Sequence, residues 1–227
     1  MTPLQQLTQE PLHEKAYSAL RDALRSGRFK PGQAMTIRTL GKELGISATP
    51  VREALQRLIA AQALQLQPNR TVIVPILTSS RFQEITKVRV RLEGLAAMEA
   101  TPHLTAADRK QLEALSSAMA EDIAEQRFAD YLAHNERFHF TLYEAANMPF
   151  LRQIIDLGWL QTGPWLNALV SEGRFHETAN THHEEILAAV SAHDAEGVKN
   201  AVQRDILEAA HYLARFLTDD VPLDEAV

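Results

Sequence analysis

A helix end, a short turn and a second helix start all fall within residues 44–55, and this segment constrains the fold more than any other part of the chain. Gly45 can adopt the left-handed backbone conformation that ends a helix. Thr49 is suited to cap the next helix, and Pro50 to occupy its first position. Apolar residues at helical spacing precede the turn: Ile37, Leu40 and Leu44. Two short helices therefore meet across a turn of three or four residues, as in a helix-turn-helix.

The second helix of this motif has one apolar face and an exposed beginning. Its apolar positions are Val51, Leu55, Leu58 and Ile59. This stripe leaves Ala48, Thr49 and Arg52 exposed at the N-terminal end of the helix. In helix-turn-helix proteins that end enters the major groove of DNA and contacts base edges. The pattern therefore predicts a DNA-recognition helix.

A β-hairpin is predicted directly after this helix. Residues 64–67 alternate apolar and polar side chains, and residues 71–74 are rich in β-branched side chains. Pro68, Asn69 and Arg70 between them are typical of a turn. The hairpin places Arg70 at its tip, and the N-terminal part is predicted to be a winged helix-turn-helix.

The segment Leu12–Leu77 resembles the DNA-binding domain of GntR-family transcriptional regulators. The matching positions are Pro31–Gly32, Leu40, Leu44–Ser47, Thr49–Leu55 and Leu58. This resemblance implies that Arg38, Thr49 and Arg52 contact DNA, and that Arg70 lies near the DNA backbone or minor groove.

Two positions depart from the family pattern. Ala48 stands where the family usually has Arg, and Thr71 stands where it usually has Gly. One DNA contact is therefore missing, and the sequence of the bound operator does not transfer from relatives. The alternative interpretation of Arg38 and Arg52 is that they are solvated charges on helix surfaces.

Charge divides the chain into a basic and an acidic part. Residues 1–78 hold ten Lys or Arg against five Asp or Glu, a net charge of +5. The whole chain carries −6, so the remainder carries −11. A basic module joined to an acidic one is expected of a DNA-binding domain attached to a domain that does not touch DNA.

Composition excludes several other classes of protein. The 227 residues include no cysteine, which rules out disulfides, thiolate metal sites and cysteine nucleophiles. No apolar stretch approaches the roughly 20 residues that span a bilayer, and the N-terminus lacks the pattern of a secretion signal. We expect a cytoplasmic protein that has no membrane segment.

The rest of the chain is predicted to be helical, so the protein is mainly α. An N-terminal domain is expected over 1–78, an antiparallel α-helical bundle of six or seven helices over 79–219, and a tail over 220–227. The expected helices are 80–101, 105–126, 128–146, 149–172, 177–192 and 194–218. Gly158 and Gly163–Pro164 are expected to weaken the fourth of them.

The helical part resembles the effector-binding FCD domain of the FadR-like branch of GntR regulators. The motifs that carry the resemblance are Arg89–Glu93 with Ala96–Ala97, Asn135–His139, Ala145–Asn147, and His183–Val190 with Asp194. Many members of that branch hold a divalent metal in the bundle. Carried over position by position, the ligands here are Asn135, His139, His183 and Asp205.

This ligand set is chemically sensible. Asn135 and His139 are four residues apart and share a helix face. Two imidazoles, a carboxylate and an amide oxygen suit zinc, nickel or manganese and leave coordination positions open. Asn135 replaces the usual Asp, and Asp205 stands where a third His is common, so the metal's identity stays open.

Four alternatives to this ligand set stay open. The histidines could be hydrogen-bonded core residues, and Asp205 could cap a helix or pair with Arg204 or Arg215. His182 could replace His183. The pair Asp130 and His134 has the same spacing as Asn135 and His139 and ranks second.

The resemblance also implies an effector. Arg89 matches a family arginine near the metal, and a guanidinium forms two parallel hydrogen bonds with a carboxylate. A surface pair of Arg89 with Glu93 is the alternative. We expect a homodimer that binds an inverted repeat in DNA and responds to a small organic acid. The rivals are a metal-dependent enzyme with two His and one carboxylate, and a regulator whose helical domain only dimerises.

Overall fold

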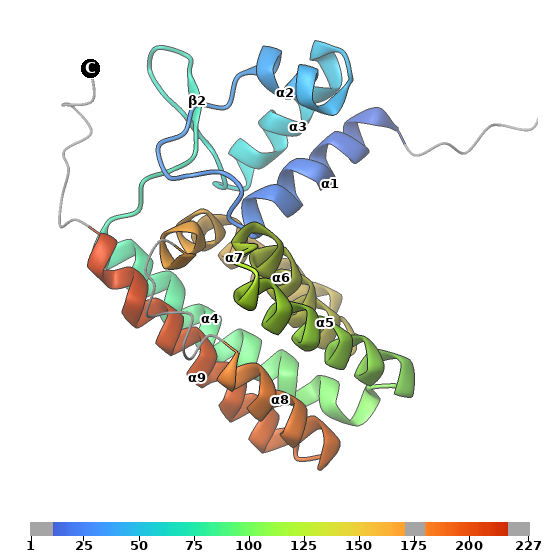
Figure 1. Cartoon of the computed structure of the whole chain (residues 1–227). Coiled ribbons are helices and arrows are strands. Elements are labelled where there is room, and N and C mark those ends of the chain that lie inside the picture. The colour runs from blue at the N-terminus through green and yellow to red at the C-terminus, as the bar shows by residue number, and fades with distance from the viewer. Residues whose placement is uncertain (1–10, 171–179, 218–227) are drawn as a thin grey trace, which may run out of the picture.

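The computed structural model describes residues 11–170 and 180–217. Residues 1–10, the expected helix ends at 171–172, 177–179 and 218, and the tail at 220–227 lie outside the described residues. Figure 1 shows the helices and the hairpin of the N-terminal part at one end of the molecule and the helical bundle at the other. The mainly α architecture predicted from the sequence is confirmed.

The N-terminal part is a three-helix unit with a small hairpin. Its helices are α1 (Leu12–Arg25), α2 (Ile37–Leu44) and α3 (Ala48–Ala60). The strands β1 (Gln65–Leu66) and β2 (Val72–Ile73) pair antiparallel, with Gln65 opposite Ile73. Arg70 lies in the turn between them at φ 67°. The predicted wing is therefore present, and the apolar stripe of α3 packs into the core through Val51, Leu55 and Leu58.

The turn between α2 and α3 forms as expected at one end and differs at the other. Gly45 adopts the left-handed conformation (φ 66°) and donates its N–H to the carbonyl of Gly41. The expectation that Thr49 caps α3 is wrong, because α3 begins at Ala48 and Ser47 occupies the cap position. Pro50 is consequently the third residue of the helix. It fits there because the first N–H groups of a helix have no acceptor within the helix.

Six α-helices form the second part within the described residues. They are α4 (Ser79–Ala100), α5 (Ala106–Ala124), α6 (Phe128–Glu144), α7 (Pro149–Val170), α8 (Thr181–Ser191) and α9 (Ala195–Leu213). Short 3-10 helices follow α4 at Thr101–His103 and α9 at Ala214–Phe216. None of the helices in the described ranges is long and apolar enough to cross a membrane.

Helix α7 joins the two parts of the molecule. It continues through Gly158 and Gly163–Pro164 instead of breaking there. Leu160 belongs to the hydrophobic core of the N-terminal unit, while Trp159 belongs to the core of the bundle. At Gly163 a Cβ atom would lie 2.4 Å from the carbonyl oxygen of Leu24. A glycine at this position therefore allows α7 to pack directly on the backbone of α1.

Candidate DNA-binding surface and metal site

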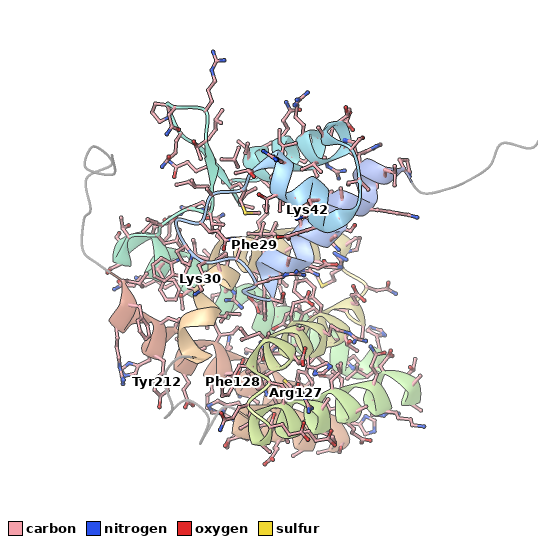
Figure 2. The ribbon with its side chains drawn as sticks, turned by 45° about the horizontal axis from the view of Figure 1, so that its top comes forward. Phe29, Lys30, Lys42, Arg127, Phe128 and Tyr212 are labelled. Carbon is pink, nitrogen blue, oxygen red and sulfur yellow. The ribbon has the colours of Figure 1, made fainter. Side chains whose placement is uncertain are left out.

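The four predicted DNA-binding residues lie on the N-terminal unit, and all are exposed to solvent. Arg38 is on α2, Thr49 and Arg52 are on α3, and Arg70 is in the wing. Within residues 11–170 and 180–217, no ion pair or side-chain hydrogen bond engages the three guanidinium groups. Figure 2 shows Lys42 of α2 at this same end, far from Arg127 and Phe128 of the bundle. A surface of unpaired cations is suited to DNA phosphates.

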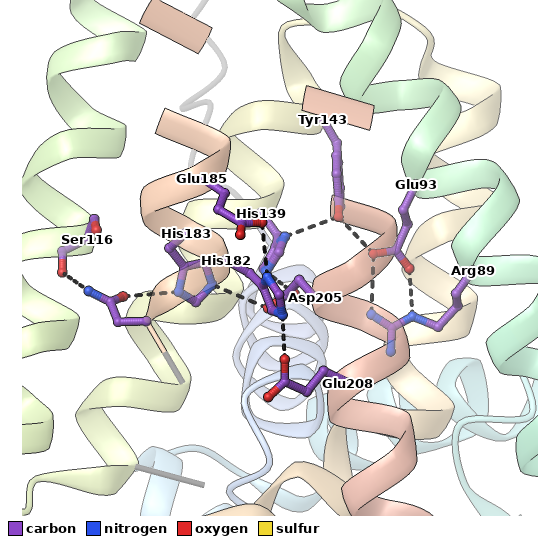
Figure 3. A network of polar contacts seen from close by, with 11 residues as sticks. Arg89, Glu93, Ser116, His139, Tyr143, His182, His183, Glu185, Asp205 and Glu208 are labelled. Carbon is purple, nitrogen blue, oxygen red and sulfur yellow. Dashed lines mark hydrogen bonds and ion pairs between the residues drawn. The ribbon is translucent and has the colours of Figure 1, made fainter. Parts of the chain in front are cut away.

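Three of the four predicted metal ligands come together inside the bundle. His139 of α6, His183 of α8 and Asp205 of α9 place one ligand atom each within 4.8 Å of one another. The Nε2 atom of His139 lies 3.2 Å from Oδ2 of Asp205, and that of His183 lies 4.0 Å from Oδ1. Figure 3 shows both rings directed at this carboxylate. The side chains are 1%, 0% and 19% exposed, respectively.

Burial and mutual charge shift the pKa values of this cluster. Burial lowers the pKa of the His183 imidazole, and although Asp205 opposes this effect, the pKa falls to about 4. Burial raises the pKa of Asp205, but the hydrogen bond from His139 and the imidazole charges outweigh it and lower the pKa to about 2. At neutral pH the cluster thus offers a neutral His183 and an ionised Asp205, the forms that bind metals.

One buried atom of the cluster lacks a partner, which is unusual for a folded protein. The Nε2 atom of His183 is fully buried and has no hydrogen bond, while its Nδ1 faces Oδ1 of Asn180 at 3.1 Å. Two ligand atoms on a tetrahedral zinc ion lie roughly 3.3 Å apart. The contacts of 3.2 and 4.0 Å are close to that separation, so these side chains fit a divalent ion.

A small cavity adjoins the cluster. Its volume is about 40 Å³, and Arg89, Asn135, His139, Trp159 and Asp205 are among its lining residues. Asn135, the fourth predicted ligand, therefore faces the same space as His139 and Asp205. A water molecule needs roughly 10–15 Å³ of such space, so the cavity has room for an ion and a few waters.

Arg89 lies at this cavity with its guanidinium already engaged. It donates to Glu93 at 2.6 Å and to the Thr162 hydroxyl at 2.9 Å, and it lies 4.6 Å from the Trp159 ring centre. The pair with Glu93 exists, as the sequence alternative proposed, but it is not a surface pair, because Glu93 is 0% exposed. An effector carboxylate would have to compete with these contacts.

Comparison with known proteins assigns this chain to a family. The sequence model described as "Bacterial regulatory proteins, gntR family" matches residues 12–74, and that of the FCD domain matches residues 84–208. The chain belongs to the GntR family. Its helical part is the FCD domain of the FadR-like regulators within that family.

Similar GntR-family members are named as transcriptional regulators. The HTH-type transcriptional regulator McbR of Escherichia coli K12 is 31% identical, over 81% of this chain and 84% of its own length. The solved structure of E. coli McbR/YncC superimposes with a TM-score of 0.85 at 28% identity, covering 92% of this chain and 99% of that one. A GntR regulator from Rhodococcus sp. RHA1 shares the fold, with a TM-score of 0.71 at 22% identity over 88% and 96% of the two chains.

This chain is accordingly a DNA-binding transcriptional regulator with an FCD effector domain. The rival interpretation as an enzyme has no support, because the GntR relatives are named as regulators and the family is not enzymatic.

The structure also decides between the alternative contacts of the site. His182 contacts Glu185 and Glu208 and is not part of the metal-type cluster of the described residues. His134 pairs with the buried Asp122 at 2.7 Å, and Asp130 lies near Arg127. Arg204 binds Glu185, not Asp205.

Sequence reasoning missed two residues around this GntR-family site. Tyr143 contacts His139 directly, and Asn180 contacts His183. Tyr143 could have been found, because it follows His139 by four positions on the same helix. Asn180 lies three residues before His183, and nothing in the sequence distinguishes it.

Proposed function

We propose that this regulator is a homodimer that binds an inverted-repeat operator in the cytoplasm, and that a small organic acid in a metal-containing FCD domain modulates its DNA binding. The DNA-binding domain is taken as residues 1–78 and the effector and dimerisation domain as 79–219. The main support is the unpartnered, buried Nε2 of His183 beside His139 and Asp205, within a chain that also presents unpaired arginines at its other end.

The proposed metal ligands are Asn135, His139, His183 and Asp205. Their donor set of two imidazoles, one carboxylate and one amide suits zinc, nickel or manganese. A bound ion would supply positive charge and open coordination positions for a carboxylate or water. The residues around it would exclude bulk water, since the three clustered side chains are largely buried.

Arg89 is the proposed anchor for the effector's carboxylate. The cavity of about 40 Å³ has too little room for an organic acid and its ordered water together. Binding would therefore displace water and draw the Arg89 guanidinium from Thr162, which it contacts at 2.9 Å. Thr162 precedes Gly163, the residue packed on α1, so a shift there would reach the DNA-binding domain. Only a difference in effector affinity between two domain arrangements can change DNA binding.

This function is tested by letting the purified protein select binding sites from fragmented DNA of the source genome. An inverted repeat bound with steep salt dependence is expected, because a dimer presents two identical recognition helices and phosphate contacts release counterions. Arg52→Ala should weaken specific binding by about 10- to 100-fold, while leaving metal and acid binding intact. Arg137→Ala, an exposed arginine of α6, is the matched control. Loss of both DNA and acid binding in folded Arg52→Ala protein would contradict the proposal.

A regulator whose helical domain only dimerises around a structural ion is the second candidate. The small cavity and the engaged state of Arg89 favour it. The melting temperature distinguishes the structural ion from the effector-binding metal site. It is measured with Zn²⁺, with a chelator, and with Zn²⁺ together with a panel of small carboxylic acids. Stabilisation by metal without any further response to acids would favour the structural ion.

A further inference from the structure

Helices α4 and α7 together form an outer face of the bundle that is rich in exposed apolar side chains. Phe150 is 74% exposed, Val88 48% and Leu157 40%. Among the exposed large apolar side chains on the described part of the bundle, only Leu207 of α9 lies away from these two helices and the residue before α7. Single exposed apolar side chains are normal, but a contiguous group of them marks an interaction site.

The same spacing of four and then three residues places these side chains on one side of each helix. The face, called here the α4–α7 face, consists of Val88, Leu92 and Leu95 on α4, and of Phe150, Ile154 and Leu157 on α7.

The two helices run antiparallel and side by side. Arg81 near the start of α4 donates to Gln161 of α7 at 3.4 Å, whereas Arg89, two turns later, packs against Gly158. A hollow of about 150 Å³ lies between the helices, and Val88 and Leu157 are among its lining residues. Arg89 borders both this hollow and the cavity beside the metal-type cluster. A partner bound on this face would therefore lie next to the proposed effector site.

The dimensions of the α4–α7 face suit a protein partner. Residues 81–99 of α4 extend over about 27 Å, and two adjacent helices are roughly 20 Å wide, which gives a footprint of roughly 500 Å². Specific dimers bury about 800 Å² per partner. This face can therefore supply most of a stable interface.

The charges on α4 fit a second copy of the same chain. Arg81 and Glu99 are both exposed and lie at opposite ends of the apolar run, on the same side of the helix. If two copies of α4 pack antiparallel across a two-fold axis near residue 90, Arg81 faces Glu99 of the partner subunit, and the apolar residues meet in the middle. A surface that binds its own copy has to be complementary to itself in this way, whereas an interface with a different protein does not.

Arg81 can make this contact without giving up its present ones. Its guanidinium donates to Glu84 at 2.9 Å and to Gln161, and its side chain is still 43% exposed. A guanidinium has five N–H donors, so further donors are free for a carboxylate.

We propose that a second copy of this chain docks on the α4–α7 face, with the two α4 helices antiparallel and with Arg81 of each copy facing Glu99 of the other. The inference rests on the proposed homodimer and names the surface through which it forms.

Sedimentation velocity of the full-length protein over a range of concentrations tests the interface. Val88→Glu and Leu157→Glu each place a carboxylate from both copies in the apolar centre of the interface. We expect each variant to raise the dimer dissociation constant by roughly 100-fold or more, because like charges there would lose water and repel. Leu207→Glu, a matched substitution of an exposed leucine on α9, should dimerise as the wild type does. Unchanged circular dichroism confirms that the variants fold.

Two results would overturn the inference and separate it from the proposed function. If the wild type and all three variants dimerise equally, the α4–α7 face is not the interface, and the proposed homodimer stands. If the wild type sediments as a monomer at concentrations at which it binds its operator, both the interface and the homodimer are rejected.

Charge reversal tests the antiparallel arrangement. Arg81→Glu and Glu99→Arg should each weaken the dimer by about 5- to 25-fold, since an exposed ion pair contributes up to about 5-fold and the two-fold axis repeats it. The double variant restores opposite charges at both ends and should recover the wild-type dissociation constant. A double variant that is weaker than either single variant would contradict the contact between Arg81 and Glu99 of the partner subunit.

Discussion

His183 is the residue whose burial has the clearest thermodynamic consequence. In the unfolded chain its pKa is near 6.5, and in the folded protein it is about 4. Between these values the unfolded state binds a proton that the folded state does not, so folding becomes less favourable as the pH falls. His182 acts in the opposite direction, because its contacts with Glu208 and Glu185 outweigh burial and raise its pKa.

We expect the metal-free wild type to lose on the order of 3 kcal/mol of unfolding free energy through His183 as the pH falls from 7 to 4. His183→Gln should lack this component, while the effect of His182 is common to both proteins. Denaturant unfolding of the two proteins in chelator at several pH values gives the difference directly. Parallel pH profiles would show that His183 is not held neutral by burial.

The sequence predicted the residues of the site better than their partners. His139, His183 and Asp205 were named from the family resemblance and do converge. The burial of the Arg89–Glu93 pair was not predictable, because a spacing of four residues is the same on a surface and in a core. The contact of Asn180 with His183 was not predictable either, because the Ser116 carbonyl that also binds the Asn180 amide lies 64 residues away along the chain.

At the scale of elements, α6 and α7 each face both functional parts. Asn135 of α6 lines the cavity, whereas its neighbour Glu136 contacts Arg25 of α1. Trp159 of α7 lines the cavity, and the next residue, Leu160, packs in the N-terminal core. If a ligand in the cavity moves α6 or α7, the contact of that helix with the DNA-binding domain must therefore move as well.

Gly163→Ala should destabilise the contact between α7 and α1. The new Cβ would lie 2.4 Å from the carbonyl oxygen of Leu24, and backbone on both sides cannot give way easily. Overpacking of this kind costs about 1–3 kcal/mol, which exceeds the gain in helix propensity. We expect a lower melting temperature, measured by circular dichroism.

Gly158→Ala is the control for this experiment, since it makes the same substitution in the same helix. The atoms nearest to its Cβ would belong to the Arg89 side chain, with Cγ at 2.9 Å, and this contact is longer than the 2.4 Å contact with backbone at Gly163. It should therefore cost less than Gly163→Ala. If the two variants melted alike, close packing of α7 on the backbone of α1 would not be the reason for glycine at 163.

Helical periodicity and Pro/Gly boundaries were sufficient to predict the helices of the bundle. The continuity of α7 was not predictable in the same way. Gly163 and Pro164 lower helix propensity locally, but the contact of Gly163 with α1 is tertiary and leaves no periodic pattern. The start of α3 was missed for a related reason, because both Ser47 and Thr49 are suitable caps.

At the scale of the whole molecule, Arg25 connects the DNA-binding unit to the bundle. It is the last residue of α1 and is 6% exposed. Its guanidinium contacts Asp156 of α7 at 2.5 Å and Glu136 of α6, and it lies 3.9 Å from the ring centre of Phe140. One of the ten cations counted in the basic part is therefore internal, where it serves domain docking.

Arg25→Met should uncouple the two units. Removing one partner of a buried ion pair costs about 3–5 kcal/mol, because the remaining charge is left without compensation. We expect calorimetry to show separate transitions for the two units, and DNA binding that no longer responds to conditions that modulate the wild type. Arg28→Met, an exposed residue just after α1, should behave as the wild type does.

The stability of Arg25→Met as a function of pH shows whether the variant is destabilised by the loss of the positive charge beside Glu136 or by the loss of packing against Phe140. Burial raises the pKa of Glu136, and Arg25 opposes that rise, so its removal should raise the pKa further. A carboxyl group whose pKa is raised in the folded state destabilises that state as the pH rises through its unfolded value. The stability deficit of Arg25→Met should therefore be larger at pH 8 than at pH 5, and adding Glu136→Gln should reduce this difference. A deficit that is independent of pH would mean that Arg25 holds the domains together through its contact with Phe140 and not through its charge.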